Sequence, residues 1–399
     1  MLTPAPAILD HVVRPTGDGG WPQALDGVLS AAMADAAQRE ITDWPNYAPT
    51  PMRRLDVLAR QLGVADIAYK DESTRFGLGS FKALGGAYAV LRLAAQHVAE
   101  TGEAPPPLRR IREGAFRQVL SSLTVTTATD GNHGRSVAWG ATMAGCRSRI
   151  YVHAGVSQGR CDAMAALGAE IVRIDGDYDD SVRRCAEDAA ANGWFVVSDT
   201  SYDGYMEVPR DVMAGYSVMA SEALDQTAGR HPTHVFIQGG VGGLAAAVLA
   251  RFWQVLGPNR PRFVVVEPSR AACLTATARQ GRPTVVTIEE ETIMAGLSCG
   301  TVSLLAWDVL KQGAGDYLTV GDDAVASTMR MLATGEAGGG PVVAGESGVA
   351  GLVGLLGVAA DPELRRAIGL DGDSRVLLFG SEGATDPDIY RALVDGAAA

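Results

Sequence analysis

Two hydrophobic patterns alternate along most of the chain. Short runs of β-branched and other apolar residues predict buried strands at residues 67–70, 123–126, 149–152, 170–174, 234–237 and 377–379. Longer stretches, in which apolar residues recur every three to four positions, predict helices at 24–39, 55–62, 84–99, 133–143, 158–167, 178–192 and 244–252. Strands that alternate with helices predict an α/β fold, with parallel sheets covered by helices on both faces.

Composition narrows the class of protein. A chain of 399 residues is long enough for two subdomains, and 48 glycines suit an α/β protein rich in strand-to-helix turns. The net charge of −12 disfavours binding to nucleic acid or to an anionic membrane. We expect a cytoplasmic protein, because no signal peptide is visible and no apolar run approaches the ~20 residues of a membrane span. The five cysteines and six histidines lack metal-ligand spacing, so we expect no metal.

Lys82 lies in an unusual setting, after Phe81 and ahead of a run of small residues. Such a lysine can place its amine in a dry pocket, where burial disfavours the ammonium form. A neutral lysine amine forms a Schiff base with an aldehyde. Because most lysines are solvated surface charges, the run gains meaning only from three distant segments.

The first of these segments is a glycine-rich loop between the predicted strand 234–237 and the predicted helix 244–252. A strand, a glycine loop and a helix start present bare N–H groups to a phosphate. A tight turn is the plainer alternative, while a dinucleotide site is disfavoured because no G-x-G-x-x-G is followed by an acidic residue. The loop consists of Gly239, Gly240, Val241, Gly242 and Gly243.

The other two segments also follow predicted strands. In the loop after residues 123–126, Asn132 could bind the phenolic oxygen of a pyridoxal ring, and backbone N–H groups could hold a substrate carboxylate. Turn chemistry at Asp130 and a structural role for His133 are the alternatives. Ser381, after residues 377–379, could meet the pyridine nitrogen as a neutral hydrogen-bond partner.

Together these residues resemble the fold-type II pyridoxal-phosphate enzymes, the relatives of serine and threonine dehydratases and of the tryptophan synthase β subunit. Within that superfamily the chain is most similar to the 2,3-diaminopropionate ammonia-lyases. The resemblance covers most of the chain from about residue 50. It rests on the segments 69–73, 75–78, 81–82, 84–88, 128–135, 199–200, 204–205, 293–297, 345–348 and 382–383.

The resemblance implies a fold, a reaction and a set of site residues. It implies two doubly wound parallel-sheet domains with the active site between them: a large domain of residues 1–87 and 214–399, and a small mobile domain of residues 88–213. The reaction is the α,β-elimination of ammonia from D- and L-2,3-diaminopropionate, through aminoacrylate, to pyruvate and two ammonia. The cofactor is pyridoxal 5'-phosphate, the enzyme is expected to be a homodimer, and the short tail after Gly383 favours a role in amino-acid catabolism.

Asp130 carries the distinction from the dehydratases, which resemble one another in having Ser or Thr at this position. In the ammonia-lyases the aspartate takes the Cα proton of the D isomer, which implies that Lys82 takes that of the L isomer; Asp199 matches an acidic position near the substrate amines. The implied catalytic residues are Lys82, Asp130 and Asp199. Lys82, Phe81, Asn132, residues 239–243 and Ser381 are implied to bind the cofactor. Ser80, Thr129, Asp130, Gly131, His133 and Glu346 are implied to bind the substrate.

Several alternatives stay open at this point. A serine, threonine or hydroxyaspartate dehydratase of the same fold is the nearest one, and a catalytically silent binding protein is a more distant one. Arg75 could line the entrance to the site or pair with Asp71 as a surface ion pair. Glu346 could orient the cofactor ring or cap a helix.

Overall fold

The computed structural model describes residues 5–100, 102 and 104–396, and the chain forms two compact units. The large unit contains the described residues of Met1–Ala31 together with Pro49–Ser80 and Met219–Ala399; the small unit contains Ala32–Ala48 and Phe81–Val218. The chain passes from the large unit to the small unit after Ser80 and returns after Val218, whereas the resemblance implied boundaries after residues 87 and 213. Residues 32–48 also join the small unit, whose mobility stays a prediction.

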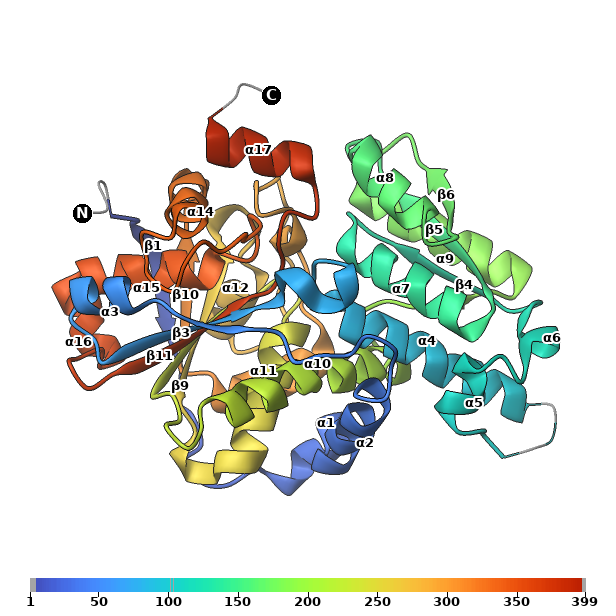
Figure 1. Ribbon diagram of the computed structural model, residues 1–399, viewed down its shortest axis with the longest axis horizontal. Helices are drawn as coiled ribbons and strands as arrows, with labels where there is room; N and C mark the ends of the chain where they lie inside the picture. Colours follow the sequence, from blue (N-terminus) through green and yellow to red (C-terminus); the bar gives the residue numbers. More distant parts are fainter. Residues whose placement is uncertain (1–4, 101, 103, 397–399) are drawn as a thin grey trace. The chain divides into compact units, whose positions relative to one another are not determined.

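A seven-stranded sheet forms the centre of the large unit, in the order β1-β10-β9-β8-β11-β3-β2 (Figure 1). The inner strands run parallel, whereas the edge strands β1 and β2 are antiparallel to their neighbours. The carboxyl ends of the inner strands therefore share one edge, where open α/β sheets bind ligands. The strands are β1 (Ile8–Val13), β2 (Met52–Arg54), β3 (Asp66–Asp71), β8 (His234–Gln238), β9 (Arg262–Pro268), β10 (Asp316–Val320) and β11 (Arg375–Gly380).

The helices of the large unit lie on opposite faces of this sheet. The crossover from β8 through α11 to β9 runs along the sheet in the opposite direction to that from β10 through α15 to β11. Because such crossovers are right-handed, α11 and α15 cover opposite faces. The helices are α1 (Asp26–Leu29), α3 (Asp56–Leu62), α11 (Gly243–Leu256), α12 (Cys273–Gln280), α13 (Leu304–Gly313), α14 (Val325–Thr334), α15 (Ala350–Ala360), α16 (Pro362–Ile368) and α17 (Pro387–Asp395).

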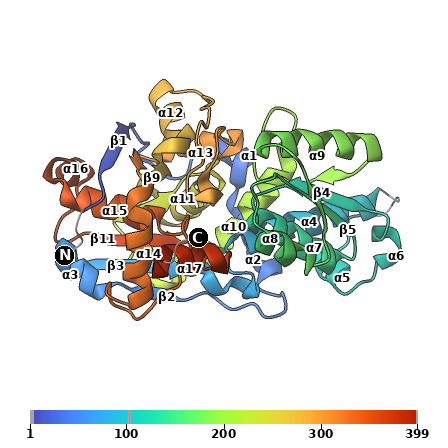
Figure 2. The same ribbon diagram turned by 90° about the horizontal axis from the view of Figure 1, so that it is seen from above.

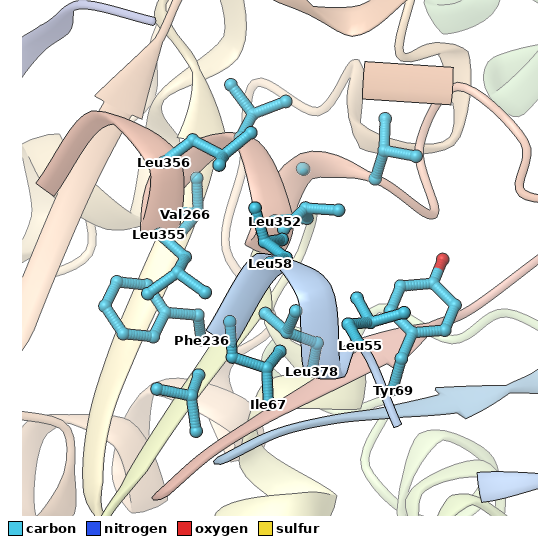
Figure 3. Close-up of a cluster of buried hydrophobic side chains, with 14 of the residues drawn as sticks. Leu55, Leu58, Ile67, Tyr69, Phe236, Val266, Leu352, Leu355, Leu356 and Leu378 are labelled. Atoms are coloured by element: carbon cyan, nitrogen blue, oxygen red, sulfur yellow. The ribbon is translucent and has the colours of Figure 1, made fainter. Parts of the chain in front are cut away.

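The core of the large unit lies between α15, α3 and the sheet. Helix α15 is buried along most of its length, and its leucines pack onto apolar strand residues (Figure 3). Burial of this much apolar surface is the main term that stabilises the unit. The side chains labelled in Figure 3 are Leu55, Leu58, Ile67, Tyr69, Phe236, Val266, Leu352, Leu355, Leu356 and Leu378.

The small unit has a four-stranded parallel sheet in the order β6-β5-β4-β7. Helix α9 covers one face, and α7 and α8 cover the other (Figure 2). The strands are β4 (Thr124–Ala128), β5 (Arg147–Val152), β6 (Glu170–Arg173) and β7 (Phe195–Val196). The helices are α2 (Ala31–Ile41), α4 (Lys82–Ala99), α5 (Leu108–Arg112), α6 (Arg117–Leu120), α7 (Asn132–Ala144), α8 (Gln158–Ala165), α9 (Tyr178–Asn192) and α10 (Glu207–Gln226), which continues into the large unit.

The structure confirms the α/β fold and each predicted strand. The helix predicted over 24–39 is broken at Ser30, whose extended backbone (ψ 158°) separates α1 from α2. Strands β1, β2, β7, β9 and β10 were not predicted. Strands β1 and β2 lie at sheet edges and are only partly buried, so their sequences lack the apolar run of an inner strand. Strand β7 has only two residues, whereas β9 and β10 are buried inner strands. Among the described residues, no helix is both long and apolar enough to cross a bilayer.

A buried ionic network joins the segment before α4 to α10. The Lys70 ammonium lies 2.7 Å from the Glu222 carboxylate, and the Arg75 guanidinium donates to both oxygens of Glu222 at 2.8 Å. Arg75 also donates to both oxygens of Glu72, at 2.7 and 2.8 Å. All four side chains are almost completely buried. Arg75 is therefore neither an entrance residue nor a surface partner of Asp71, which corrects both alternatives drawn from the sequence.

Replacing Glu222 with Gln should strongly destabilise the protein. Two buried cations would then share a single carboxylate, and an uncompensated buried charge costs about 3–5 kcal/mol. Urea denaturation followed by circular dichroism measures this loss. The control is Arg60→Gln, which removes a pair with Asp56 whose two side chains are mostly exposed, and it should leave the midpoint unchanged. Equal midpoints for Glu222→Gln and Arg60→Gln would contradict the role of the network.

Candidate active site

Lys82 is the first residue of α4, and its amine forms an ion pair with the carboxylate of Asp199. Phe81 precedes it and packs against Tyr216 with ring centroids 4.6 Å apart. The dry pocket expected for Lys82 is found only in part, because its side chain keeps 22% of its exposure. Burial opposes the ionisation of Asp199, but the Lys82 ammonium holds the pKa of that carboxyl well below its usual value.

The segment that carries Asp199 is held by Tyr205, a residue without a role in the sequence-based prediction. The Tyr205 hydroxyl donates to the Val196 carbonyl at 2.8 Å and accepts from the Ser198 N–H at 3.0 Å. These two bonds hold the chain just after β7, immediately before Asp199. The Gly204-Tyr205 match to the ammonia-lyases was the only signal in the sequence.

His133 completes this cluster and has one nitrogen to spare. Its Nε2 lies 2.8 Å from the Val197 carbonyl, which can only accept, so Nε2 carries the proton. The other nitrogen, Nδ1, is buried without a hydrogen-bond partner and lies 4.0 Å from Asp199 Oδ2. Burial lowers the pKa of His133, so the ring is neutral at neutral pH and Nδ1 offers a lone pair.

Helices α4 and α7, which carry Lys82 and His133, pack side by side with little space between them. The Ala87 N–H of α4 donates to Ser136 Oγ of α7 at 2.9 Å. A Cβ on Gly86 would lie 2.5 Å from that same oxygen, so only glycine permits this approach. The close contact fixes the starts of the two helices relative to each other.

The Asp130 carboxylate points to a histidine that the sequence did not single out. Asp130 Oδ1 lies 2.9 Å from Nε2 of His153, the residue that follows β5. The Asp130 carbonyl also accepts from Arg160 Nη1 at 3.3 Å. The adjacent strands β4 and β5 run parallel, so residues just beyond their carboxyl ends come together. That rule was the one signal that could have paired Asp130 with His153.

Thr129 stabilises the loop that leads into α7. Its hydroxyl accepts from the N–H groups of Gly131 at 3.0 Å and Gly134 at 3.2 Å. From the sequence, N–H groups of this loop were expected to bind a substrate carboxylate, but the Gly131 N–H already donates to the Thr129 hydroxyl. Asn132 is the first residue of α7, and its contact with the cofactor stays a prediction.

The glycine loop of the large unit has the geometry expected of an anion site. Gly242 has a φ of +98°, and a Cβ there would lie 3.0 Å from Ala306, so glycine is required. It is the N-cap of α11, and no side chain caps that helix. Within the described part of the chain, the N–H groups of Gly240, Val241 and Gly243 have no partner.

Ser381 follows β11 and is buried. Its Oγ accepts from Gln238 Nε2 at 2.6 Å. Gln238 is the last residue of β8, the strand that leads into the glycine loop. Ser381 and the glycine loop are therefore neighbours at the carboxyl edge of the sheet in the large unit.

Glu382 gathers several loops of the large unit that match the ammonia-lyases. Its backbone carbonyl accepts from the Gly345 N–H at 2.9 Å, and its Oε1 accepts from the Ser347 N–H at 3.0 Å. Glu382 also forms an isolated antiparallel β-bridge with Ser80. Glu346 lies between these loop contacts and is buried. The N-cap residue of α15 is Val349, and both alternatives for Glu346 stay predictions.

Comparison with known proteins decides the family. A family model described as pyridoxal-phosphate dependent enzyme matches residues 44–382. The curated diaminopropionate ammonia-lyase of Escherichia coli K12 is 38% identical over 372 residues, which cover 92% of this chain and 92% of that protein. The chain belongs to the pyridoxal-phosphate-dependent enzymes, in the diaminopropionate ammonia-lyase family.

Solved structures of this lyase family agree in fold over nearly the whole chain. The holo diaminopropionate ammonia lyase of Escherichia coli has a TM-score of 0.88 at 34% identity and covers 98% of both chains. A second structure of that enzyme, in complex with an aminoacrylate-PLP azomethine reaction intermediate, has a TM-score of 0.86 at 36% identity and covers 98% of both chains. The pyridoxal-phosphate lyase fold expected from the sequence is thereby confirmed.

The residues of this lyase fit pyridoxal phosphate. The unpartnered N–H groups at the start of α11 suit a phosphate, because a helix N-terminus attracts negative charge. Lys82 supplies the amine that an aldehyde requires. The described residues contain no group of three or more His, Cys, Asp or Glu side chains that could hold a metal ion.

Replacing Asp199 with Asn should remove an acid-dependent part of the stability. The folded-state pKa of Asp199 lies below the unfolded-state value of about 4, so its ionisation stabilises the fold above that pH. The contribution disappears as the pH falls towards the folded-state pKa. After removal of the cofactor, urea denaturation should show that the wild type loses more stability than Asp199→Asn between about pH 6 and about pH 3.

The control for this measurement is Asp308→Asn, which removes a carboxylate that is 44% exposed on α13. The stability of Asp308→Asn should change with pH in the same way as that of the wild type. If Asp199→Asn also follows the wild type over the whole pH range, its ion pair with Lys82 does not stabilise the fold.

Proposed function

We propose that this enzyme eliminates ammonia from both D- and L-2,3-diaminopropionate and yields pyruvate and two ammonia. The observation that carries the proposal is the placement of two carboxylates in the small unit. Asp199 lies against the Lys82 amine, and Asp130 lies on the loop before Asn132, where dehydratases have Ser or Thr. A diamine substrate has a second positive charge, which a site with two carboxylates can bind.

Proton transfer at Cα is assigned to two different side chains. The Lys82 amine would hold the cofactor, and the same amine would take the Cα proton of the L isomer. Asp130 takes the Cα proton of the D isomer. Bound pyridoxal phosphate delocalises the electron pair that this step leaves on Cα. Two bases on opposite faces of one planar group explain turnover of both isomers.

Departure of the β-amine is assigned to the cluster around Asp199. The Asp199 carboxylate and the lone pair on His133 Nδ1 accept hydrogen bonds from the β-ammonium group and keep it protonated. The carbon–nitrogen bond then breaks with its electron pair moving to nitrogen, so neutral ammonia leaves. The released aminoacrylate takes up water and gives pyruvate and the second ammonia, which balances the reaction.

The remaining assignments follow the chemistry of each group. The N–H groups of residues 239–243 bind the phosphate, and Asn132 binds the phenolic oxygen. Ser381 binds the pyridine nitrogen, and Phe81 packs beside Lys82. The substrate contacts Ser80, Thr129, Gly131, His133 and Glu346 in addition to Asp130. A homodimer in the cytoplasm with a role in amino-acid catabolism is part of the same proposal.

The first test is pyruvate release from the cofactor-loaded enzyme, supplied separately with the D isomer, the L isomer, L-serine and L-threonine. Both isomers should give pyruvate. Asp130→Asn should lower kcat for the D isomer by about 10²–10⁴-fold, the usual contribution of a general base, and should spare the L isomer. Lys82→Ala should abolish both reactions.

The same assay separates this proposal from the dehydratase alternative. Turnover of serine or threonine without turnover of either diaminopropionate isomer would assign the enzyme to the dehydratases. Unchanged D-isomer turnover in Asp130→Asn would remove Asp130 from the mechanism. No turnover of any of the four amino acids would leave only a cofactor-binding protein.

A further inference from the structure

Gln238 uses its side-chain amide in an unusual way. This residue is 1% exposed, and its Nε2 donates to the Phe379 carbonyl at 2.8 Å and to Ser381 Oγ at 2.6 Å. Its Oε1 is buried without any hydrogen-bond partner. An unpaired buried acceptor costs free energy, so we infer that the two hydrogen bonds that the amide nitrogen donates are the reason for a glutamine at this position.

The orientation of the amide follows from the Phe379 carbonyl. A carbonyl oxygen only accepts, so the nitrogen of Gln238 must face β11 and not its oxygen. The second N–H then points at Ser381 Oγ, which becomes an acceptor in that bond. The Ser381 hydroxyl proton must therefore point elsewhere, and the described residues give it no acceptor.

We propose that Gln238 is a positioning residue that makes Ser381 a hydrogen-bond donor to the pyridine nitrogen of the cofactor. A nitrogen that accepts from a hydroxyl stays unprotonated, which leaves the ring a weaker electron acceptor than a pyridinium. The inference rests on the proposed contact between Ser381 and that nitrogen. Gln238 acts through Ser381 and is not itself a catalytic residue.

Nitrogen NMR of the holoenzyme tests this directly, with pyridoxal phosphate labelled with ¹⁵N in the ring. The wild-type resonance should be that of an unprotonated nitrogen. In Gln238→Glu the carboxylate accepts the Ser381 proton, so Ser381 presents a lone pair and the ring nitrogen should become protonated. Ser381→Asp supplies the reference for a pyridinium, because its carboxylate faces the nitrogen directly.

Two further variants keep the test decisive. Gln238→Met has a similar volume and no donor, so Ser381 can present its proton or its lone pair, and the ring nitrogen should become protonated as the pH is lowered. Ser381→Ala checks the underlying contact. A resonance that moves in Ser381→Ala but in neither Gln238 variant would overturn the role of Gln238 alone. A resonance unmoved in Ser381→Ala, or already protonated in the wild type, would overturn both roles.

A separate observation concerns His153, whose ring is fixed by two contacts. The Gly155 N–H donates to His153 Nδ1 at 3.1 Å, so in the neutral ring the proton is on Nε2. Nε2 then donates to Asp130 Oδ1, 2.9 Å away. One carboxylate oxygen of Asp130 is thereby held, and the other stays available as a proton acceptor.

We infer that His153 is a positioning residue for Asp130 and so determines the use of the D isomer. The inference rests on the proposed role of Asp130 as the base for that isomer. A carboxylate held by one oxygen presents its second oxygen in a single direction. The base for the L isomer is Lys82, the first residue of α4, which takes no part in the two bonds of His153 described above, so His153 should not affect L turnover.

The test compares the two isomers in two His153 variants. His153→Leu removes the donor and should lower kcat for the D isomer roughly ten- to hundredfold, the factor that a hydrogen bond to a charged group is worth. Turnover of the L isomer should change little. His153→Gln can place an amide N–H near the position of Nε2 and should restore most D turnover.

The ratio of D to L turnover separates the possible outcomes. An equal loss for both isomers in His153→Leu would show a structural role and overturn the inference, as would unchanged D turnover. If Asp130→Asn itself spares the D isomer, the proposed function of Asp130 fails before His153 is considered.

Discussion

A buried network of Lys70, Glu72, Arg75 and Glu222 joins two segments of the large unit that are far apart in the sequence. Lys70 lies near the end of β3, Glu72 and Arg75 lie in the segment that follows it, and Glu222 comes from α10, far along the chain. Each charge is stable in the interior only because the opposite charges lie at hydrogen-bond distance. The network therefore forms only when this segment and the end of α10 have come together within the large unit.

Several groups assigned to the proposed chemistry are polar groups that the fold leaves unpaired. The N–H groups at the start of α11, His133 Nδ1 and the Ser381 hydroxyl proton have no partner within the described residues. Unpaired buried polar groups are rare because they cost free energy. In this lyase they lie at helix starts or just after strands, where secondary structure itself leaves backbone groups unsatisfied.

Much of the fold could be predicted because its signals are local. Strands such as β8 and β11 are short apolar runs, and helices repeat apolar residues at their own period, so these elements could be predicted from neighbouring residues alone. The same holds for the glycine loop, since a glycine such as Gly242 is required by a local φ of +98°. The edge strands β1 and β2 were missed because they are only partly buried, which leaves little pattern in the side chains. The inner strands β9 and β10 are buried and were also missed, although their apolar residues carry the same local signal as β8.

The residues that escaped prediction act through single contacts with distant partners. Gln238, His153 and Tyr205 are examples, because no local pattern in the sequence shows which distant group each of them contacts. Arg75 was misread for the same reason, because its partner Glu222 is 147 residues away. The sequence by itself determined the kinds of elements, their order and the chemical groups that follow each strand, because hydrophobic period and backbone conformation are properties of neighbours. Only the tertiary structure decided that Lys82 meets Asp199 across 117 residues and Gln238 meets Ser381 across 143, because ion pairs and hydrogen bonds depend on distance in space.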